Sequence, residues 1–211
     1  MAAIAVIDYD MGNLHSVCKG LEQAGATPKI TDCPKELEQA EAVVLPGVGA
    51  FDPAVQQLRL RGLVEPIKQA IASGKPFLGI CLGLQILFEW SEEGEEPGLG
   101  IVAGGVRRFR PEPGIAIPHM GWNQLEITQP TSPIWQQLSP QPWVYFVHSY
   151  YVDPTDSQVR AAMVTHGSQT VTAAIAQNNL MAVQFHPEKS STTGLQILSN
   201  FVQQVKSLVP A

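Results

Sequence analysis

The sequence predicts an α/β fold of three layers, with helices on both faces of a mostly parallel central sheet and an additional antiparallel strand region. In the first 90 residues, short apolar runs alternate with segments of helical period, which is typical of a parallel sheet. After residue 100, short strands separated by turn residues favour antiparallel pairing. The chain has 211 residues, 45% of them hydrophobic, so we expect one core and a single domain over residues 1–211.

The first half of the chain is expected to supply the parallel strands. Apolar runs predict buried strands at 2–7, 28–30, 41–45 and 77–80. Apolar residues at helical spacing predict helices over 14–24, up to residue 60, and over 64–72. Asn13 is placed to cap the first helix and Gly25 to end it. Ligands of such folds bind at the carboxyl ends of the strands, where loops 9–13 and 46–51 lie.

The second half is expected to add the antiparallel strands. Residues 91–100 are acidic and rich in glycine and proline, which predicts a surface loop. The expected strands follow at 102–109, 115–117, 122–127, 143–147, 159–164, 171–177 and 180–185. Asn178 and Asn179 form the hairpin turn between the last two, because asparagine tolerates positive φ. A helix over 193–208 closes the chain, with its apolar residues facing the core.

Cys81 lies where the apolar run 77–80 changes to the helical period of 82–89. Gly79 and Gly83 flank it, as expected for a tight turn on which backbones approach closely. This is the pattern of a nucleophile elbow with cysteine in place of serine. A thiol at a helix N-terminus is favoured as the thiolate. The alternative is a buried core cysteine, since free cysteine is commonly buried.

His186 is the candidate general base for this thiol. It follows an apolar strand, and Pro187 favours an extended conformation at His186. Residues two apart in an extended segment point to the same side, so Glu188 is expected to orient the imidazole. Nucleophile, base and orienting acid then form a triad, Cys81–His186–Glu188. The alternative is a strand exit with a solvated acid.

The other four histidines are weaker candidates. His119 is expected to be structural and His148 to shape a pocket, whereas His15 and His166 are assigned no role.

A triad of this kind performs acyl transfer, which needs backbone donors for the oxyanion. The Leu82 N–H, one residue past the nucleophile, is one candidate. The second is expected from the loop around Val48 and Gly49, where glycines on both sides of Val48 let a peptide plane rotate. An oxyanion hole that forms only after such a rotation would act as a switch.

Composition excludes several classes of function. The net charge of −6 argues against a nucleic-acid-binding protein, and no apolar run reaches the 18 residues of a membrane span. The three cysteines form no CxxC pair, which suits a reducing cytoplasm. The one basic cluster, residues 107–110, is expected to be solvated or to face a partner rather than to bind phosphate.

Two motifs carry a resemblance to a known family. Gly79-Ile-Cys-Leu-Gly-Leu-Gln85 and Gln184-Phe-His-Pro-Glu188 resemble the nucleophile and His-x-Glu motifs of class I (triad) glutamine amidotransferases. The resemblance implies hydrolysis of glutamine to glutamate and ammonia through a glutamyl thioester on Cys81. It implies no cofactor and no metal, and it places the use of ammonia on another chain.

Three further segments resemble one branch of the family, the glutaminase subunits of imidazole glycerol phosphate synthases: 9–13, 46–51 and 119–123. That branch implies a heterodimer with a (β/α)-barrel cyclase of histidine biosynthesis, to which ammonia would pass. By resemblance, the substrate-binding residues are Gln85, His148, Ser149 and Tyr150. The expected interface residues are Tyr9, Asn13, Trp122, Tyr145 and Lys189, because exposed aromatics and a charge beside a site suit a partner contact. For Trp122 and Tyr145 the alternative is core packing.

Three other interpretations remain open at this point: a glutaminase serving another synthase, a catalytically silent regulatory subunit, and a free-standing cysteine hydrolase. The identity of the partner that stimulates the chain would test whether it serves another synthase. Hydrolytic activity without any partner would indicate a free-standing hydrolase.

Overall fold

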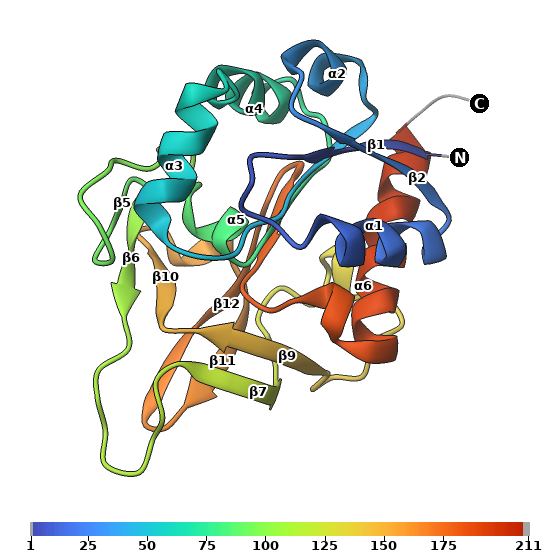
Figure 1. Ribbon diagram of the computed structural model, residues 1–211. Helices are drawn as coiled ribbons and strands as arrows, with labels where there is room; N and C mark the ends of the chain where they lie inside the picture. The colour runs from blue at the N-terminus through green and yellow to red at the C-terminus, as the bar shows by residue number, and fades with distance from the viewer. Residues whose placement is uncertain (1, 209–211) are drawn as a thin grey trace.

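The computed structural model of the protein describes residues 2–208 and has the expected three layers (Figure 1). Five strands form the parallel part of the main sheet, in the order β2-β1-β3-β4-β13. These are β1 (Ala2–Ile7), β2 (Ala26–Thr31), β3 (Ala42–Leu45), β4 (Phe77–Ile80) and β13 (Leu180–Val183). β13 comes from the far end of the sequence and pairs with β4 in parallel, which places residues 81 and 184 at the same edge.

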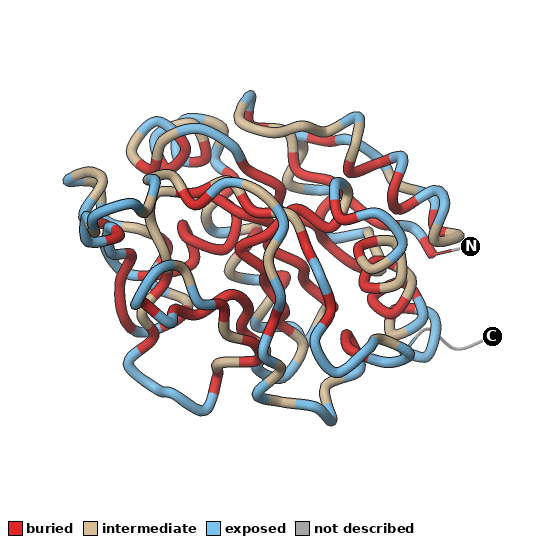
Figure 2. The backbone as a smooth tube through the Cα atoms, turned by 90° about the horizontal axis from the view of Figure 1, so that it is seen from below, coloured by how far each residue is buried: buried red, intermediate tan, exposed pale blue. Residues whose placement is uncertain are grey.

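Helices cover both faces of this sheet. They are α1 (Leu14–Gln23), α2 (Pro34–Gln39), α3 (Phe51–Leu60), α4 (Val64–Ala72), the single turn α5 (Leu82–Gln85) and α6 (Ser191–Leu208). Alternate residues of β1 face the two sides, so Ile4 and Val6 pack with α1 and α6, whereas Ala5 and Ile7 pack with α2, α3 and α4. Figure 2 shows the resulting buried interior, with exposed residues on the surrounding loops.

The remaining strands extend and flank the parallel sheet, largely by antiparallel pairing. They are β5 (Trp90–Ser91), β6 (Gly104–Arg108), β7 (His119–Gln124), β8 (Glu126–Ile127), β9 (Trp143–His148), β10 (Tyr150–Pro154), β11 (Arg160–His166) and β12 (Gln169–Gln177). β7 and β9 pair with each other in a separate two-stranded sheet. Residues 2–208 also contain three short 3-10 helices: η1 (Pro133–Trp135), η2 (Ser157–Val159) and η3 (Pro187–Lys189).

Several expected elements differ from the structure. No strand forms at 115–117, where only an isolated bridge joins Glu112 to Ile115; the prolines nearby lack the N–H that a ladder requires. The expected strand 122–127 is divided at Leu125 into β7 and β8. The helix after Cys81 ends at Gln85, so its dipole is that of one turn only. Strand β10 and helix α2 were not predicted.

The acidic loop 91–100 lies on the surface, as expected, and binds the N-terminal part of α3. Glu93 accepts a hydrogen bond from the Phe51 N–H at 2.9 Å, and the Asp52 carboxylate accepts from the backbone of Glu95 and Glu96. Glu96 also pairs with Arg59. Glu93 thus satisfies a donor at the start of α3 and Glu96 pairs with a cation of the same helix, which accounts for two of the acidic residues of the segment.

None of the helices within residues 2–208 combines the length and apolar character that crossing a membrane would require.

Candidate active site

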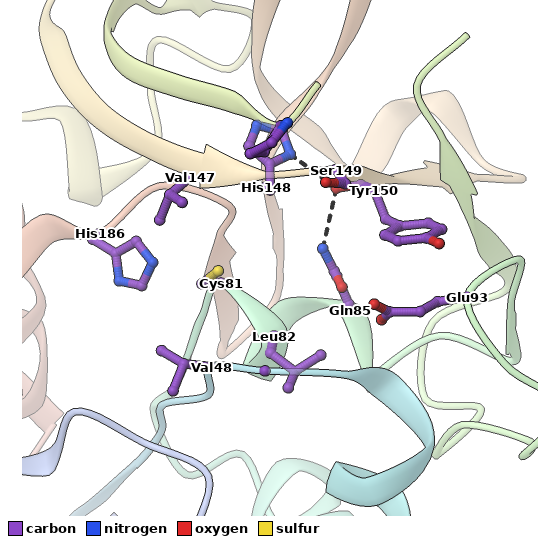
Figure 3. Close-up of a pocket in the computed structure, with 12 residues that line it drawn as sticks. Val48, Cys81, Leu82, Gln85, Glu93, Val147, His148, Ser149, Tyr150 and His186 are labelled. Atoms are coloured by element: carbon purple, nitrogen blue, oxygen red, sulfur yellow. Dashed lines mark hydrogen bonds between the residues drawn. The ribbon is translucent and has the colours of Figure 1, made fainter. Parts of the chain in front are cut away.

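Cys81 is the residue on the turn between β4 and α5, and its backbone is strained. Its φ of 55° and ψ of −109° are uncommon for a residue other than glycine. The Cys81 N–H donates to the Val183 carbonyl of β13 at 2.8 Å, which holds the turn against the neighbouring strand. Cys81 is 7% exposed and borders a cavity (Figure 3). The geometry is that of a nucleophile elbow rather than an ordinary core cysteine.

The two glycines around Cys81 are required by close packing. A Cβ at Gly79 would lie 2.9 Å from the Ala182 Cβ, and one at Gly83 would lie 1.9 Å from the Leu45 carbonyl oxygen. Atoms of the neighbouring strands therefore occupy the space that a side chain would need at either glycine, and the elbow packs tightly between β3 and β13.

His186 lies at the end of the segment that follows β13, beside the same cavity. Figure 3 shows its ring pointing across the cavity toward Cys81. Nδ1 of His186 contacts Oε1 of Glu188 at 2.8 Å, and both side chains are buried. Burial would lower the pKa of His186, but the adjacent Cys81 sulfur and Glu188 carboxylate raise it to about 10. The structure thus brings together the three residues of the predicted triad.

The route to the His186–Glu188 contact differs from the prediction. His186 is extended, with φ −101° and ψ 98°, as expected before Pro187. Glu188 lies in the 3-10 helix η3 and not in an extended segment. The strand β9 holds His186 in place, since the His186 N–H donates to the Tyr145 carbonyl at 3.0 Å. The turn of η3 then brings the Glu188 carboxylate back to the ring.

A cavity of about 330 Å³ lies in front of the thiol. The residues expected to bind substrate all line it: Gln85, His148, Ser149 and Tyr150. Gln85 donates from Nε2 to the Tyr150 carbonyl at 3.1 Å, and Nδ1 of His148 bonds the same oxygen at 2.8 Å (Figure 3). The volume suits an amino-acid-sized ligand rather than a macromolecular segment.

Glu93 also lines the cavity and was not predicted as a site residue. Its carboxylate comes from the acidic loop, and burial raises its pKa. No signal in the sequence separated it from the loop's other acids, because its position depends on the contact with Phe51.

The predicted oxyanion donors are engaged elsewhere in this structure. The Val48 N–H donates to the Met11 carbonyl at 2.8 Å, and the Leu82 N–H to the Gly47 carbonyl at 3.3 Å. Gly49 has φ +98°, a conformation suited to glycine. Val48, Gly49 and Leu82 all border the cavity, but the loop would have to change its conformation before Val48 could donate to a bound ligand.

A chain of hydrogen bonds connects β7 to the cavity wall and determines the tautomers of two buried histidines. The Tyr150 carbonyl can only accept, so Nδ1 of His148 carries the proton and Nε2 accepts. His119 therefore donates from Nδ1 to Nε2 of His148 at 3.0 Å. Nε2 of His119 accepts in turn from the Asn123 amide at 3.1 Å. His119 is structural, as expected, and both rings are neutral.

Burial is also the main reason why the pKa of His119 is lowered to about 4 and that of His148 to about 3. Between pH 6.5 and these values the unfolded chain binds more protons than the folded one, so stability falls as the pH falls. We expect the urea midpoint to drop between pH 7.5 and pH 5, with each ring contributing a slope of up to about 1.4 kcal/mol per pH unit.

Chemical unfolding of the protein and two variants at pH 7.5, 6.5, 5.75 and 5 measures this slope. His119→Gln keeps a donor for His148 but removes one titrating ring, so its slope is expected to be shallower. His15→Gln, at an exposed histidine, is the matched control and should match the unsubstituted protein. Equal slopes for all three proteins would contradict the assignment of two neutral buried histidines.

The residues expected at an interface fall into two groups. Trp122 is 49% exposed and meets the half-buried Tyr145 edge-on at 6.1 Å between ring centroids, so Trp122 is not core packing. Lys189 is exposed, and Asn13 is half-buried and caps α1 through the Ser16 N–H, as predicted. Tyr9 is only 1% exposed: its expected place on an exposed surface is wrong, because its hydroxyl is drawn inward to the Pro46 carbonyl at 2.8 Å.

Comparisons with known proteins identify the family to which the chain belongs. The sequence model of the family described as "Glutamine amidotransferase class-I" matches residues 5–205. The "Imidazole glycerol phosphate synthase subunit HisH" of Nostoc punctiforme is 76% identical over 211 residues, which is 100% of both chains. The subunit of the same name from Microcystis aeruginosa is 74% identical over 208 residues, 99% of this chain and 98% of the relative.

Solved structures at low identity share the fold. A "Crystal structure of glutamine amidotransferase" superposes with a TM-score of 0.74 at 19% identity, covering 96% of this chain and 98% of that one. The glutaminase domain of Trypanosoma brucei CTPS with bound acivicin has a TM-score of 0.73 at 19% identity, covering 100% and 96%. The family match over nearly the whole length and the full-length relatives give one conclusion: this chain belongs to the class I glutamine amidotransferase family.

Proposed function

We propose that the chain hydrolyses glutamine to glutamate and ammonia through a glutamyl thioester on Cys81, and supplies the ammonia to a cyclase subunit that makes imidazole glycerol phosphate and AICAR in histidine biosynthesis. The observation that carries the chemistry is the meeting of Cys81, His186 and Glu188 at a cavity of amino-acid size. The pathway rests on the printed names of the full-length relatives. Residues 1–211 would act as one glutamine amidotransferase domain.

The reaction assigns a role to each member of the triad. The Cys81 sulfur attacks the side-chain amide carbon of glutamine, and His186 gives a proton to the departing ammonia. His186 then takes a proton from water, which attacks the thioester and releases glutamate while the sulfur leaves as thiolate. Glu188, bonded to Nδ1, keeps Nε2 of His186 directed at the reacting atoms.

The walls of the cavity suit the rest of the substrate. Free glutamine carries an ammonium and a carboxylate on its α-carbon. The Glu93 carboxylate would attract the ammonium, and the backbone of Ser149 and Tyr150 together with the Gln85 amide offers polar groups at a fixed spacing. Because the groups of this wall are buried and held by hydrogen bonds, they cannot move to admit a substrate with a different side chain.

Activation by a partner follows from the oxyanion loop. The Val48 N–H donates to the Met11 carbonyl and the Leu82 N–H to the Gly47 carbonyl, so the developing oxyanion lacks the donors that the mechanism requires. Rotation of the peptide between Gly47 and Val48 would break both bonds, because it carries the Gly47 carbonyl and the Val48 N–H, and would turn the Val48 N–H into the cavity. Loss of one such donor costs about 10²–10³ in kcat in acyl-transfer enzymes, so we expect slow turnover until a partner moves the loop.

The partner is proposed to cover the face of the β7–β9 sheet that continues the cavity wall. Met120 and Trp122 of β7 and Trp143 of β9 are exposed there, and Val147 of the same face lines the cavity. An apolar patch of this kind marks an interaction surface. We infer a heterodimer with a (β/α)-barrel cyclase, with Tyr145 and Lys189 beside the contact. All three cysteines are free, which suits a cytoplasmic complex.

Glutamate release by the purified chain, alone and with the cyclase plus its nucleotide ligand, tests this function. We expect slow turnover alone and stimulation of at least about 100-fold in the complex, because at least one oxyanion donor is gained. High activity that the cyclase does not change would retain the triad chemistry but contradict both the partner and the gating. No glutamate release in either case would favour a silent regulatory subunit.

A further inference from the structure

Gln184 lies next to the nucleophile although 103 residues separate the two in sequence. The pairing of β13 with β4 aligns Val183 with Ile80, so the next residues along, Gln184 and Cys81, lie side by side. The Gln184 side chain is 0% exposed, and its Nε2 lies 3.7 Å from the Cys81 sulfur. A buried amide has to satisfy both of its ends, and here one end is satisfied by the reactive sulfur.

The orientation of this amide follows from its neighbours. The Tyr150 carbonyl can only accept, so the Gln85 atom that contacts it at 3.1 Å must be the amide nitrogen. The same nitrogen contacts the side chain of Gln184 at 3.1 Å, which must therefore present its oxygen. Nε2 of Gln184 is then the end that faces Cys81. Gln85 thus determines the orientation of the Gln184 amide, whose N–H group donates toward Cys81.

We propose that Gln184 is the hydrogen-bond donor that orients the Cys81 sulfur and stabilises its thiolate, with Gln85 holding the donor in this orientation. Its catalytic consequence rests on the proposed glutaminase function. The helix that follows Cys81 has a single turn, so its dipole offers little stabilisation to the sulfur. A neutral donor at a buried thiolate favours the charged form and adds no charge of its own.

The donor acts at two stages of the reaction. Before attack it keeps the sulfur lone pair aimed into the cavity. During hydrolysis of the thioester the carbon–sulfur bond breaks, the electron pair returns to sulfur, and the water proton goes to His186. Negative charge reappears on sulfur at this step, and the N–H of Gln184 Nε2 is in place to stabilise it by donating a hydrogen bond. Removing the donor should therefore lower kcat more than it raises KM.

Alkylation of Cys81 by iodoacetamide, followed by peptide mass spectrometry from pH 6 to pH 9, tests the donor without glutamine. Gln184→Met keeps the length of the side chain and removes the donor. We expect alkylation of Cys81 at pH 7 to slow about 10-fold. This factor corresponds to the low end of the free energies that hydrogen bonds to charged groups contribute. Gln184→Glu still accepts from Gln85 but places an oxygen against the sulfur, so the slowing should be larger.

Unfolding cannot mimic this result, because a disordered chain would expose Cys81 and speed its alkylation. Gln169→Met is the matched control: Gln169 is also buried, its amide bonds Arg110 and Glu112, and none of these three residues lines the cavity. That variant should keep the alkylation rate of the unsubstituted protein. In Gln85→Met the orienting contact is lost, so adding Gln184→Met should slow alkylation less than it does in the unsubstituted background.

Unchanged alkylation in both Gln184→Met and Gln184→Glu would overturn the proposal, as would equal slowing in Gln169→Met. Glutaminase assays of the complex with the cyclase form the second arm, in which Gln184→Met should lower kcat about 10-fold or more with KM within about 3-fold. If the unsubstituted complex does not hydrolyse glutamine, the proposed function fails while the alkylation arm still decides the role of Gln184.

Discussion

Cys81→Ala is expected to abolish glutamine-dependent synthesis by the complex while leaving ammonia-dependent synthesis by the cyclase intact. The thioester route needs the sulfur, and Cys81 carries the one thiol among the described residues that line the cavity. Loss of a nucleophile in a triad costs roughly 10⁴–10⁶ in kcat. Product formation with glutamine and with ammonium chloride, assayed on the same complex, measures both activities.

Cys81→Ala changes the structure little, so a loss of glutamine-dependent activity can be assigned to the missing sulfur. Alanine removes one buried atom and leaves the Cys81 backbone bond to Val183 in place. Cys33→Ala is the matched control, because Cys33 precedes α2, makes no side-chain cap and lies away from the cavity. It should retain both activities. Loss of the ammonia-dependent reaction in Cys81→Ala would mean that the residue matters for assembly with the cyclase rather than for the chemistry.

Gly83→Ala is expected to be the most destabilising single substitution at the elbow. The new Cβ would lie 1.9 Å from the Leu45 carbonyl oxygen and 2.9 Å from its carbon, and both are backbone atoms of a buried strand. Neither can move without shifting β3 or separating it from α5. We expect a loss of at least about 3 kcal/mol in the free energy of unfolding, measured by urea denaturation, or failure to fold.

Gly62→Ala is the control for this prediction. It measures the free-energy cost of placing alanine at a positive φ where there is no steric overlap. Gly62 has φ +65°, and no other atom lies within 4 Å of the place that an alanine Cβ would occupy. Alanine there meets only the left-handed strain of about 1 kcal/mol. Equal losses in the free energy of unfolding for the two variants would show that steric overlap with Leu45 is not the reason why Gly83→Ala is destabilising.

The elbow and the His-Pro-Glu segment could be predicted because their chemistry is local. Glycines two residues on either side of Cys81 indicate close packing, and Pro187 alone restricts His186. The alternation of apolar runs and helical segments likewise predicted the parallel sheet, since each strand has to bury both faces. The hairpin between β12 and β13 followed from the asparagine pair at the turn.

Elements whose pairing depends on distant segments were missed or misplaced. β9 and β10 are consecutive in sequence but belong to different sheets, because the chain changes partners at Ser149 from β7 to β6 and β12. β10 is short, and Asp153 and Pro154 at its end leave too few residues for an apolar alternation to be detected. Tyr9 was misplaced for a similar reason: its burial comes from the Pro46 carbonyl on another loop.

The sequence by itself determined which residues have the chemistry for the reaction and that they lie at strand ends, since residue type and spacing carry that information. Only the tertiary structure decided that Val48 donates to Met11, that His119 and His148 are neutral, and that Gln184 faces the sulfur. Each of these depends on strand register and burial, which arise when segments far apart in the chain pack together and lose contact with water.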